Sequence, residues 1–286
     1  MVPVGSYRMP RGSRDGVMRR SPDGALSRLM QVCGDAVIVR AWPRSGDVRI
    51  RAEARSREAA AAAVQRMRFA LGTDHDLGPF QRAFRQDRLL GPIMRRKPWL
   101  RPLRRPEPFE ALAWAVSEQL IDGARAVHIQ RALVARHGPR SSGGFLRDVP
   151  SAHAVSRLSP AEIERCGMSP TRAITLVRAA KEVASGRADL STHEPAWRRL
   201  RAISGIGPWT IECLAYHGQG RDDQIPAGDL SYIKLVGRLA GLGRRATEDE
   251  VREFFAAYAP FAALAGTYLG HAAHSEVSPR PSFSGR

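Results

Sequence analysis

Two glycines and a proline stand close together in the segment 197–215, where the surrounding apolar residues have helical spacing. Gly205 and Gly207 permit positive φ and close approach of the backbone, and Pro208 is preset for the first turn of a helix. The segment is therefore predicted to form a helix, a tight turn and a second helix. In such a turn, N–H groups and the N-terminus of the second helix point to one place, which suits a phosphate oxygen. Carbonyls on its other side could hold a monovalent cation, although for the glycines alone an ordinary helical hairpin is the favoured explanation.

The cysteines show none of the spacings typical of a metal site. Cys33, Cys166 and Cys213 are isolated and odd in number. This argues against a disulfide framework, a zinc site and a four-cysteine iron–sulfur cluster, and it fits a reducing, cytosolic setting. The histidines also show no metal-binding spacing.

The charge balance points to a polyanionic partner, above all nucleic acid. Lysine and arginine total 45 against 28 acidic residues, so the formal net charge is +17. Only Lys97, Lys181 and Lys234 are lysines, and such an arginine bias can also reflect GC-rich coding. The composition is that of a globular protein, no apolar run approaches the ~20 residues of a membrane span, and the first residues lack the apolar segment of a secretory signal.

The elements that must position the glycine turn fall into two classes. In the first part of the chain, residues 36–40 and 48–51 have strand patterns around a turn, which predicts a β-hairpin. Ser56 then precedes an alanine-rich helix that extends to about Leu71. Strands followed by a helix indicate a small α+β domain.

From Pro108 onward, the chain is predicted to be helical throughout. Asp122 can cap one helix, and capping boxes begin at Ser159 and Thr247. The predicted fold is therefore an α+β N-terminal domain followed by an all-α domain. The predicted division is a disordered leader (1–22), a small α+β domain (23–95), a basic Arg/Pro-rich connector (96–106), an all-α domain (107–273) and a disordered tail (274–286).

Four pieces of the second half together form a specific pattern: the segments 108–112, 118–120, 203–210 and 226–229, which read PFEAL, EQL, ISGIGPWT and PAGD. In these pieces the sequence resembles the helix–hairpin–helix (HhH-GPD) DNA glycosylase superfamily, and within it the bacterial 3-methyladenine DNA glycosylase II branch. The resemblance covers residues of about 105 to 270 well and extends more weakly to the N-terminal domain.

The resemblance implies how the protein would hold DNA. Gly205 and Gly207 would hold the backbone phosphate through main-chain N–H groups, and the other DNA-binding residues around them would be Pro208, Thr210 and Gln119. Leu120 would be the wedge inserted from the minor groove, although a buried core leucine is the alternative. The carbonyls of Arg201, Ile203 and Ile206 would be the ligands of a structural Na⁺ or K⁺, and no other cofactor is implied.

The resemblance also implies that Asp229 is the catalytic carboxylate. Breaking an N-glycosidic bond builds positive charge on the sugar, which a nearby carboxylate stabilises while it orients or deprotonates the attacking water. Asp229 fits the N-cap of a helix beginning at Leu230 just as well, and the two roles are compatible. Trp209 stands where bifunctional members carry the lysine of Schiff-base chemistry, so lyase activity is not expected.

The predicted base pocket departs from the family pattern. Trp209, Cys213 and Tyr268 are the pocket residues that the resemblance implies, but Cys213 replaces a usual tyrosine and Gly270 replaces an aromatic residue. Glu118 also replaces the usual glycine or glutamine. The range of accepted bases therefore stays open.

The resulting expectation is a monofunctional, monomeric and cytoplasmic DNA N-glycosylase that flips and excises alkylated bases from double-stranded DNA. Two alternatives stay open: a non-catalytic protein that binds damaged DNA, and a glycosylase for deaminated or oxidised bases.

Overall fold

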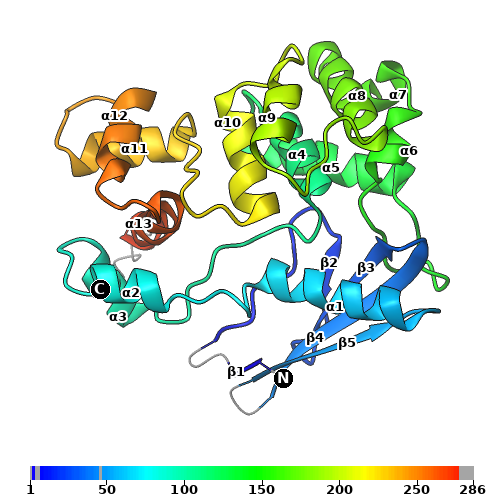
Figure 1. Cartoon of the computed structure of the whole chain (residues 1–286), viewed down its shortest axis with the longest axis horizontal. Coiled ribbons are helices and arrows are strands. Elements are labelled where there is room, and N and C mark those ends of the chain that lie inside the picture. The colour runs from blue at the N-terminus through cyan, green and yellow to red at the C-terminus, as the bar shows by residue number, and fades with distance from the viewer. Residues whose placement is uncertain (1, 4–6, 45–46, 277–286) are drawn as a thin grey trace, which may run out of the picture. The chain divides into compact units, whose positions relative to one another are not determined.

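The chain folds into two compact units, each built from two separate stretches of sequence. The computed structural model describes residues 2–3, 7–44 and 47–276 (Figure 1). Unit 1 comprises residues 1–75 and 101–220, and unit 2 comprises residues 76–100 and 221–286. Within the described part of the chain, no helix is both long enough and apolar enough to cross a membrane.

An antiparallel sheet of five strands, in the order β1-β5-β4-β3-β2, opens unit 1. The strands are β1 (Val2–Pro3), β2 (Met18–Arg20), β3 (Leu26–Val32), β4 (Asp35–Arg44) and β5 (Asp47–Glu53). Helix α1 (Arg57–Leu71) packs along the sheet (Figure 1), and its residues Ala59, Ala63 and Met67 share an apolar core with the strands. The side chain of Ser56 accepts the Ala59 N–H at 3.1 Å, which confirms the predicted helix start.

The helical part of unit 1 surrounds a core that includes Leu112, Trp197 and Leu200. Its elements are α4 (Pro108–Glu118), α5 (Gly123–His137), α6 (Ala152–Ser156), α7 (Pro160–Glu164), α8 (Pro170–Ala184), α9 (Glu194–Arg201), α10 (Pro208–Cys213) and the π-helix η1 (Leu214–Gly218). The capping box at Ser159 is formed as predicted.

Unit 2 is helical and has an aromatic core. Its elements are α2 (Gly78–Phe84), α3 (Leu90–Arg96), α11 (Leu230–Leu239), α12 (Glu248–Ala256) and α13 (Ala262–Glu276). Phe80 is fully buried, and its ring centroid lies 5.2 Å from that of Tyr268 and 5.7 Å from that of Phe261. The capping box at Thr247 is formed as predicted.

A buried ion network joins the sheet to the helices of unit 1. Arg28 on β3 is 1% exposed and its Nη2 lies 2.5 Å from Glu110 Oε2 on α4 and 3.2 Å from Asp148 Oδ1. Asp15 accepts hydrogen bonds from Arg105 Nη1 at 2.9 Å and from Trp114 Nε1 at 2.8 Å. Burial alone would raise the pKa of Asp15, but the charge of Arg105 and hydrogen bonds from Ser13, Val17 and Trp114 outweigh it, so the pKa is lowered.

The structure corrects the predicted boundaries in three places. The expected leader contains β2 and the fully buried Val17, because the polar segment around Asp15 folds back onto the sheet and α4. Residues 76–100 belong to unit 2 and form α2 and α3, so the α+β part ends near residue 75 and the connector 96–106 is divided between the units. Residues 274–276 of the expected tail continue α13, and the expectation for 277–286 lies outside the described residues.

Candidate DNA-binding and catalytic site

The glycine turn has the geometry that the sequence predicts. It connects α9 to α10, and the N–H of Ile206 donates to the carbonyl of Ile203 at 3.0 Å. Gly205 has a φ of +92°, and a Cβ there would lie 2.5 Å from Oγ1 of Thr175. Gly207, the N-cap of α10, would meet no atom within 4 Å with a Cβ, so the turn is open on that side. Only glycine therefore fits at position 205, where the turn packs on α8.

The predicted wedge is exposed. Leu120 lies between α4 and α5, has a relative exposure of 104% and adopts the left-handed conformation with φ +56°. Across the described ranges, no other large apolar side chain is so exposed. Leu120 is therefore not the core leucine that was the alternative.

Gln119 links the wedge to the glycine turn. Its Nε2 donates to the carbonyl of Gly205 at 2.7 Å and to Oγ1 of Thr210 at 2.9 Å. Arg172 of α8 donates from Nη1 to the carbonyl of Gln119 at 3.2 Å. The amide of Gln119, predicted to contact DNA, is thus engaged within the protein and holds Leu120 in a fixed relation to the hairpin.

The start of α5 fixes the other side of the wedge turn. Asp122 accepts the N–H groups of Ala124 and Arg125, each at 2.9 Å, which confirms the predicted N-cap. The hydrogen bond from Arg125, with that from Ala124, holds the pKa of this carboxyl below its usual range.

Asp229 caps α11 in unit 2. Its Oδ1 accepts the N–H of Ser231 at 2.8 Å and the hydroxyl of Ser231 at 2.6 Å. Oδ2 accepts no hydrogen bond from the described residues. Gly228 precedes it, and a Cβ there would lie 2.7 Å from Oε1 of Glu248, a flexible side chain that could move aside. The cap therefore fixes one oxygen and leaves the other available to a ligand.

The three predicted pocket residues lie in different surroundings. Trp209 on α10 is half-buried, and its buried Nε1 has no hydrogen-bond partner within the described part of the chain. Cys213, one helical turn later, is 7% exposed. Tyr268 is fully buried in the aromatic core of unit 2 and its hydroxyl donates to the carbonyl of Leu100 at 3.1 Å. The structure thus gives Tyr268 a core position and not a pocket wall.

A cavity of about 560 Å³ in unit 1 reaches Cys213. Its walls also include Trp114 and Glu118 from α4 and Asp15 from the N-terminal segment. Glu118 accepts a hydrogen bond from Nε2 of Gln130 at 2.9 Å. The cavity therefore brings an indole, a thiol and carboxylates together, and Glu118 at its wall lies two residues from the wedge.

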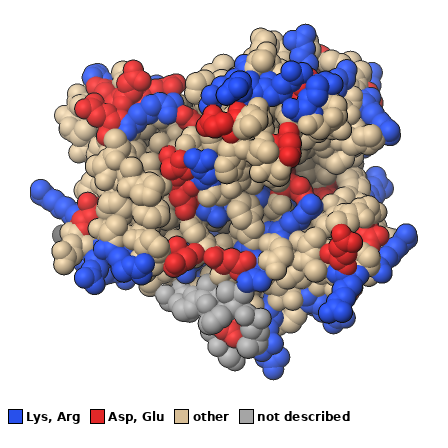
Figure 2. All heavy atoms as spheres, in the orientation of Figure 1, with Lys and Arg blue, Asp and Glu red and all other residues tan. Residues whose placement is uncertain are grey.

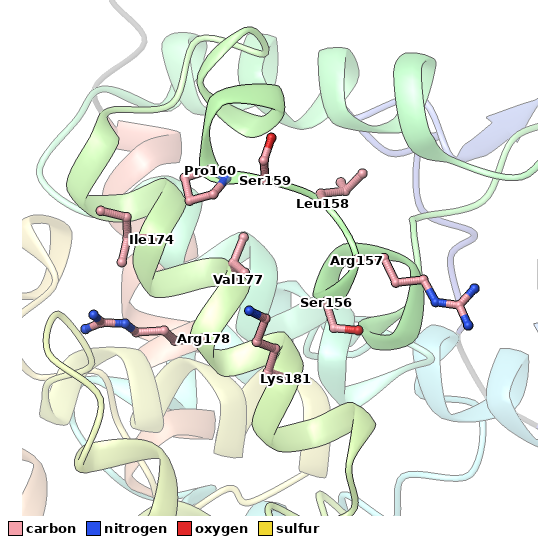
Figure 3. A pocket seen from close by; sticks show the side chains of 9 residues that line it. All are labelled: Ser156, Arg157, Leu158, Ser159, Pro160, Ile174, Val177, Arg178 and Lys181. Carbon is pink, nitrogen blue, oxygen red and sulfur yellow. The ribbon is translucent and has the colours of Figure 1, made fainter.

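A second hollow of about 370 Å³ lies along α8 and contains none of the predicted site residues (Figure 3). Ile174, Val177 and Lys181 of α8 line it together with Leu158 and Pro160, the first residue of α7. Figure 2 shows basic side chains gathered over the part of the surface where Figure 1 places α8 and α9. The three arginines near the end of α9, Arg198, Arg199 and Arg201, are all exposed, so the approach to the glycine turn is basic.

The predicted cation ligands are backbone carbonyls of the same turn. The Ile203 carbonyl accepts one hydrogen bond, while those of Arg201 and Ile206 accept none from the described residues. Because a carbonyl oxygen has two lone pairs, all three retain capacity for a hard cation. The described residues hold no group of three His, Cys, Asp or Glu side chains placed to bind a metal ion.

Sequence patterns missed several residues that position the site. Thr175 and Arg172 hold the turn and the wedge from α8, and nothing in their spacing indicates this. Ser231 was detectable, since a serine two residues after an N-cap aspartate is typical of a local Asx turn.

Comparisons with known proteins agree with this geometry. A model of the HhH-GPD superfamily of base excision DNA repair proteins matches residues 113–260. The chain is 27% identical to a Bacillus subtilis protein named DNA-3-methyladenine glycosylase over 203 residues, which are 68% of this chain and 67% of that protein. The 3-methyladenine DNA glycosylase of Archaeoglobus fulgidus superposes with a TM-score of 0.78 at 23% identity, covering 93% of this chain and 96% of that one, and thus shares its fold.

The Schizosaccharomyces pombe 3-methyladenine DNA glycosylase, solved in complex with abasic DNA, superposes with a TM-score of 0.56 at 27% identity. The match covers 66% of this chain and 92% of that one. The family match spans more than half of the sequence and includes the wedge, the glycine turn and the capped carboxylate. The chain belongs to the HhH-GPD superfamily of base excision DNA repair proteins.

Proposed function

We propose that this protein is a monofunctional DNA glycosylase that removes alkylated bases of the 3-methyladenine type and leaves an abasic site. The observation that carries the proposal is the exposed Leu120, held by Gln119 against the glycine turn. An exposed leucine in a left-handed turn has no packing function within unit 1, whereas a base-flipping enzyme needs a wedge at a fixed distance from its phosphate anchor. The names of the relatives support the substrate class.

The glycine turn is the phosphate anchor in this proposal. The turn is open at Gly207, where a Cβ would meet no atom within 4 Å, so a phosphate could approach its backbone there, and the exposed arginines of α9 add positive charge nearby. A Na⁺ or K⁺ ion on the carbonyls of Arg201, Ile203 and Ile206 would add a further positive charge beside the phosphate.

Asp229 is the catalytic carboxylate in this proposal. When the glycosidic C–N bond breaks, its electron pair goes to the base, whose positive charge is neutralised, and cationic character develops on the sugar. The unpartnered Oδ2 of Asp229 stabilises that cation and accepts a proton from the water that adds to the sugar carbon. An alkylated purine is already cationic and leaves without a strong general acid, so one carboxylate is sufficient.

Trp209 and Cys213 are the pocket residues that we retain. An indole stacks well on a cationic base. Trp209 carries no amine, so it cannot form the Schiff base of a lyase. We therefore expect no trapping of the protein on DNA by borohydride.

The decisive experiment is single-turnover base release from methylated duplex DNA. The wild-type protein should release 3-methyladenine, and Asp229→Asn should lower the rate by at least ~10²-fold, because the developing cation loses its carboxylate. Asp249→Asn, an exposed acid on α12, is the matched control and should retain the wild-type rate. Wild-type activity in Asp229→Asn would refute the assigned mechanism.

The same assay separates the alternatives. Release of hypoxanthine or an oxidised base in place of 3-methyladenine would identify a glycosylase of another specificity. Tight binding to an abasic-site analogue with no release of any base would identify a damage-binding protein.

A further inference from the structure

The C-terminal end of α11 borders a shallow basic hollow of about 340 Å³ in unit 2. Its lining consists only of cationic residues and glycines: Lys234, Gly237, Arg238, Gly241, Gly243, Arg244 and Arg245. No acidic residue is among these lining residues, and such a concentration of positive charge favours an anion.

Glycine packing builds this hollow. Gly237 on α11 lets the loop 241–245 fold back on the helix, since a Cβ at this position would lie 2.3 Å from the carbonyl oxygen of Arg244. The N–H of Leu242 donates to the carbonyl of Gly237 at 2.9 Å, and the N–H of Ala246 donates to that of Ile233 at 3.1 Å. These contacts place Arg245 on the same side as the cations of the helix.

Three of the cations are not neutralised by the protein. Lys234, Arg238 and Arg245 form no side-chain hydrogen bond or ion pair with any described residue. Arg244, in contrast, is paired with Glu250, with Nη2 2.6 Å from Oε1. Three clustered and unpaired charges repel one another, and an anion would relieve that repulsion.

The hollow is continuous with the surroundings of Asp229 along one face of α11. Ser231, Lys234 and Arg238 follow at i, i+3 and i+7, which places them on one stripe, and all three are exposed. Ser231 begins the stripe and holds the carboxylate of Asp229. From Ser231 to Arg238 the helix rises about 10 Å, which is roughly the rise of three nucleotides along one strand of a duplex.

We propose that Lys234, Arg238 and Arg245 bind a phosphodiester of the DNA strand, within about three nucleotides of the nucleotide at Asp229. The inference rests on the proposed function, because it takes Asp229 as the residue beside the sugar. The glycine turn anchors DNA to unit 1, whereas the carboxylate belongs to unit 2. A phosphate contact on α11 would give the unit that carries the carboxylate its own hold on the strand.

The first test is DNA binding by a triple variant, Lys234→Gln, Arg238→Gln and Arg245→Gln, in the full chain. Its affinity for duplex DNA with an abasic-site analogue should fall about 10-fold at 0.1 M salt, and the log–log salt dependence should become shallower by about 1. Arg51→Gln, Arg55→Gln and Arg57→Gln form a charge-matched control on exposed residues at the end of the sheet. This control should change neither quantity, and circular dichroism should show that both variants are folded.

The second test locates the contact. Single phosphates on each side of the lesion are replaced by neutral methylphosphonates, one at a time, up to four nucleotides away. Wild-type protein should lose affinity at one or two of these positions, and the triple variant should show no further loss there. Equal losses in both triple variants, or additive effects of methylphosphonate and variant at every position, would overturn the proposal.

These binding tests do not depend on catalysis. If no base is released but the methylphosphonate effect disappears in the triple variant, the phosphate site stands and the proposed glycosylase activity fails. If bases are released normally and the triple variant binds like wild type, the site fails and the proposed activity stands.

Discussion

Leu120 combines two properties that a stable protein normally avoids at one residue. Its side chain is wholly exposed, and its backbone has the left-handed φ of +56° that disfavours any residue with a Cβ. The left-handed conformation costs about 1–2 kcal/mol for an L-residue. Because the side chain is exposed, no hydrophobic stabilisation from burial offsets this cost. The surrounding hydrogen bonds of Gln119 and Asp122 hold the turn in this conformation. The strain is thus concentrated at the residue with the proposed role as wedge.

Substitution of Leu120 should therefore lower activity with little effect on stability. In Leu120→Gly, the free energy of unfolding should change by less than about 1 kcal/mol, because glycine adopts the left-handed conformation freely but loses more entropy on folding. Single-turnover base release should fall at least about 10-fold, because no side chain fills the gap left by the flipped base. Phe145→Ala removes another exposed apolar side chain and should leave the rate unchanged. An unaltered rate in Leu120→Gly would remove the wedge from the mechanism.

At the scale of elements, α8 contacts the glycine turn through Thr175 and contacts α9, which leads into the turn, through Glu182. Near the start of α8, Thr175 contacts the carbonyl of Ser204 in the turn at 2.9 Å. Toward its end, Glu182 lies 2.5 Å from Nε of Arg199 on α9 and 2.8 Å from Nη2 of Arg187. α9, which leads into the turn, is therefore held against α8 by an ion pair as well as by apolar packing.

The ion pair between α8 and α9 gives the stability a defined pH dependence. Hydrogen bonds from Arg187, and then from Arg199, lower the pKa of Glu182 from 4.5 to about 2. Because the folded state favours the ionised carboxyl, the stabilisation is fully present above about pH 4.5 and is lost as the pH falls toward 2. Its size should be below about 1 kcal/mol, since these arginines are largely exposed to solvent.

The measurement is the difference in unfolding free energy between wild type and Glu182→Gln, from urea denaturation at several pH values. The difference should be present at pH 7 and should shrink between pH 4.5 and 2. Glu253→Gln, an exposed acid on α12, serves as the control and should show no such trend. A difference that grows on acidification would contradict the assigned ion pair.

At the scale of the whole molecule, internal ion pairs leave the net charge of +17 unchanged, because each pair contributes one positive and one negative charge. The buried network of Arg28 with Glu110 and Asp148 uses its charges within the fold, and removal of one partner would leave an unpaired buried ion. In contrast, the arginines near the end of α9 and the cations of the α11 hollow are exposed, although Arg199 and Arg244 among them also form ion pairs. The exposed cations are the part of the charge that a polyanion can reach.

The exposed charge should appear in the salt dependence of DNA binding. Neutralisation of ~4 to 6 phosphates predicts a log–log slope of affinity against salt concentration of about −4 to −5. Fluorescence anisotropy with undamaged duplex DNA between 50 and roughly 300 mM salt measures this slope. A slope near zero would contradict DNA binding by these surfaces.

Local features of the fold could be predicted from the sequence, because they depend on few neighbouring residues. Ser56, Asp122 and Thr247 cap helices as predicted, since a cap is formed by a side chain and the N–H groups two or three residues later. The glycine turn was predictable for the same reason, and the matching family model agrees with the resemblance that its motif carried.

Features that depend on distant partners were not predictable. Nothing near Asp15 indicates that it accepts a hydrogen bond from Trp114, 99 residues later, so its segment was expected to be disordered. Tyr268 has the spacing of a pocket residue in the family, but Phe80, from a separate stretch of the chain, packs against it in a core. Residues 76–100 could not be assigned to unit 2 because their partners follow residue 220.

The interleaved chain has a consequence for incomplete products of this gene. A chain that stopped near Gly220 would keep the wedge and the whole glycine turn, because unit 1 ends there. It would lack Asp229, and it would leave Phe80 without the aromatic rings of Phe261 and Tyr268 that bury it. In the proposed function, such a fragment would keep the phosphate anchor and the wedge without the carboxylate, and it would expose an apolar surface on the remaining part of unit 2. The proposal therefore predicts that a chain without residues 221–286 binds DNA but releases no base.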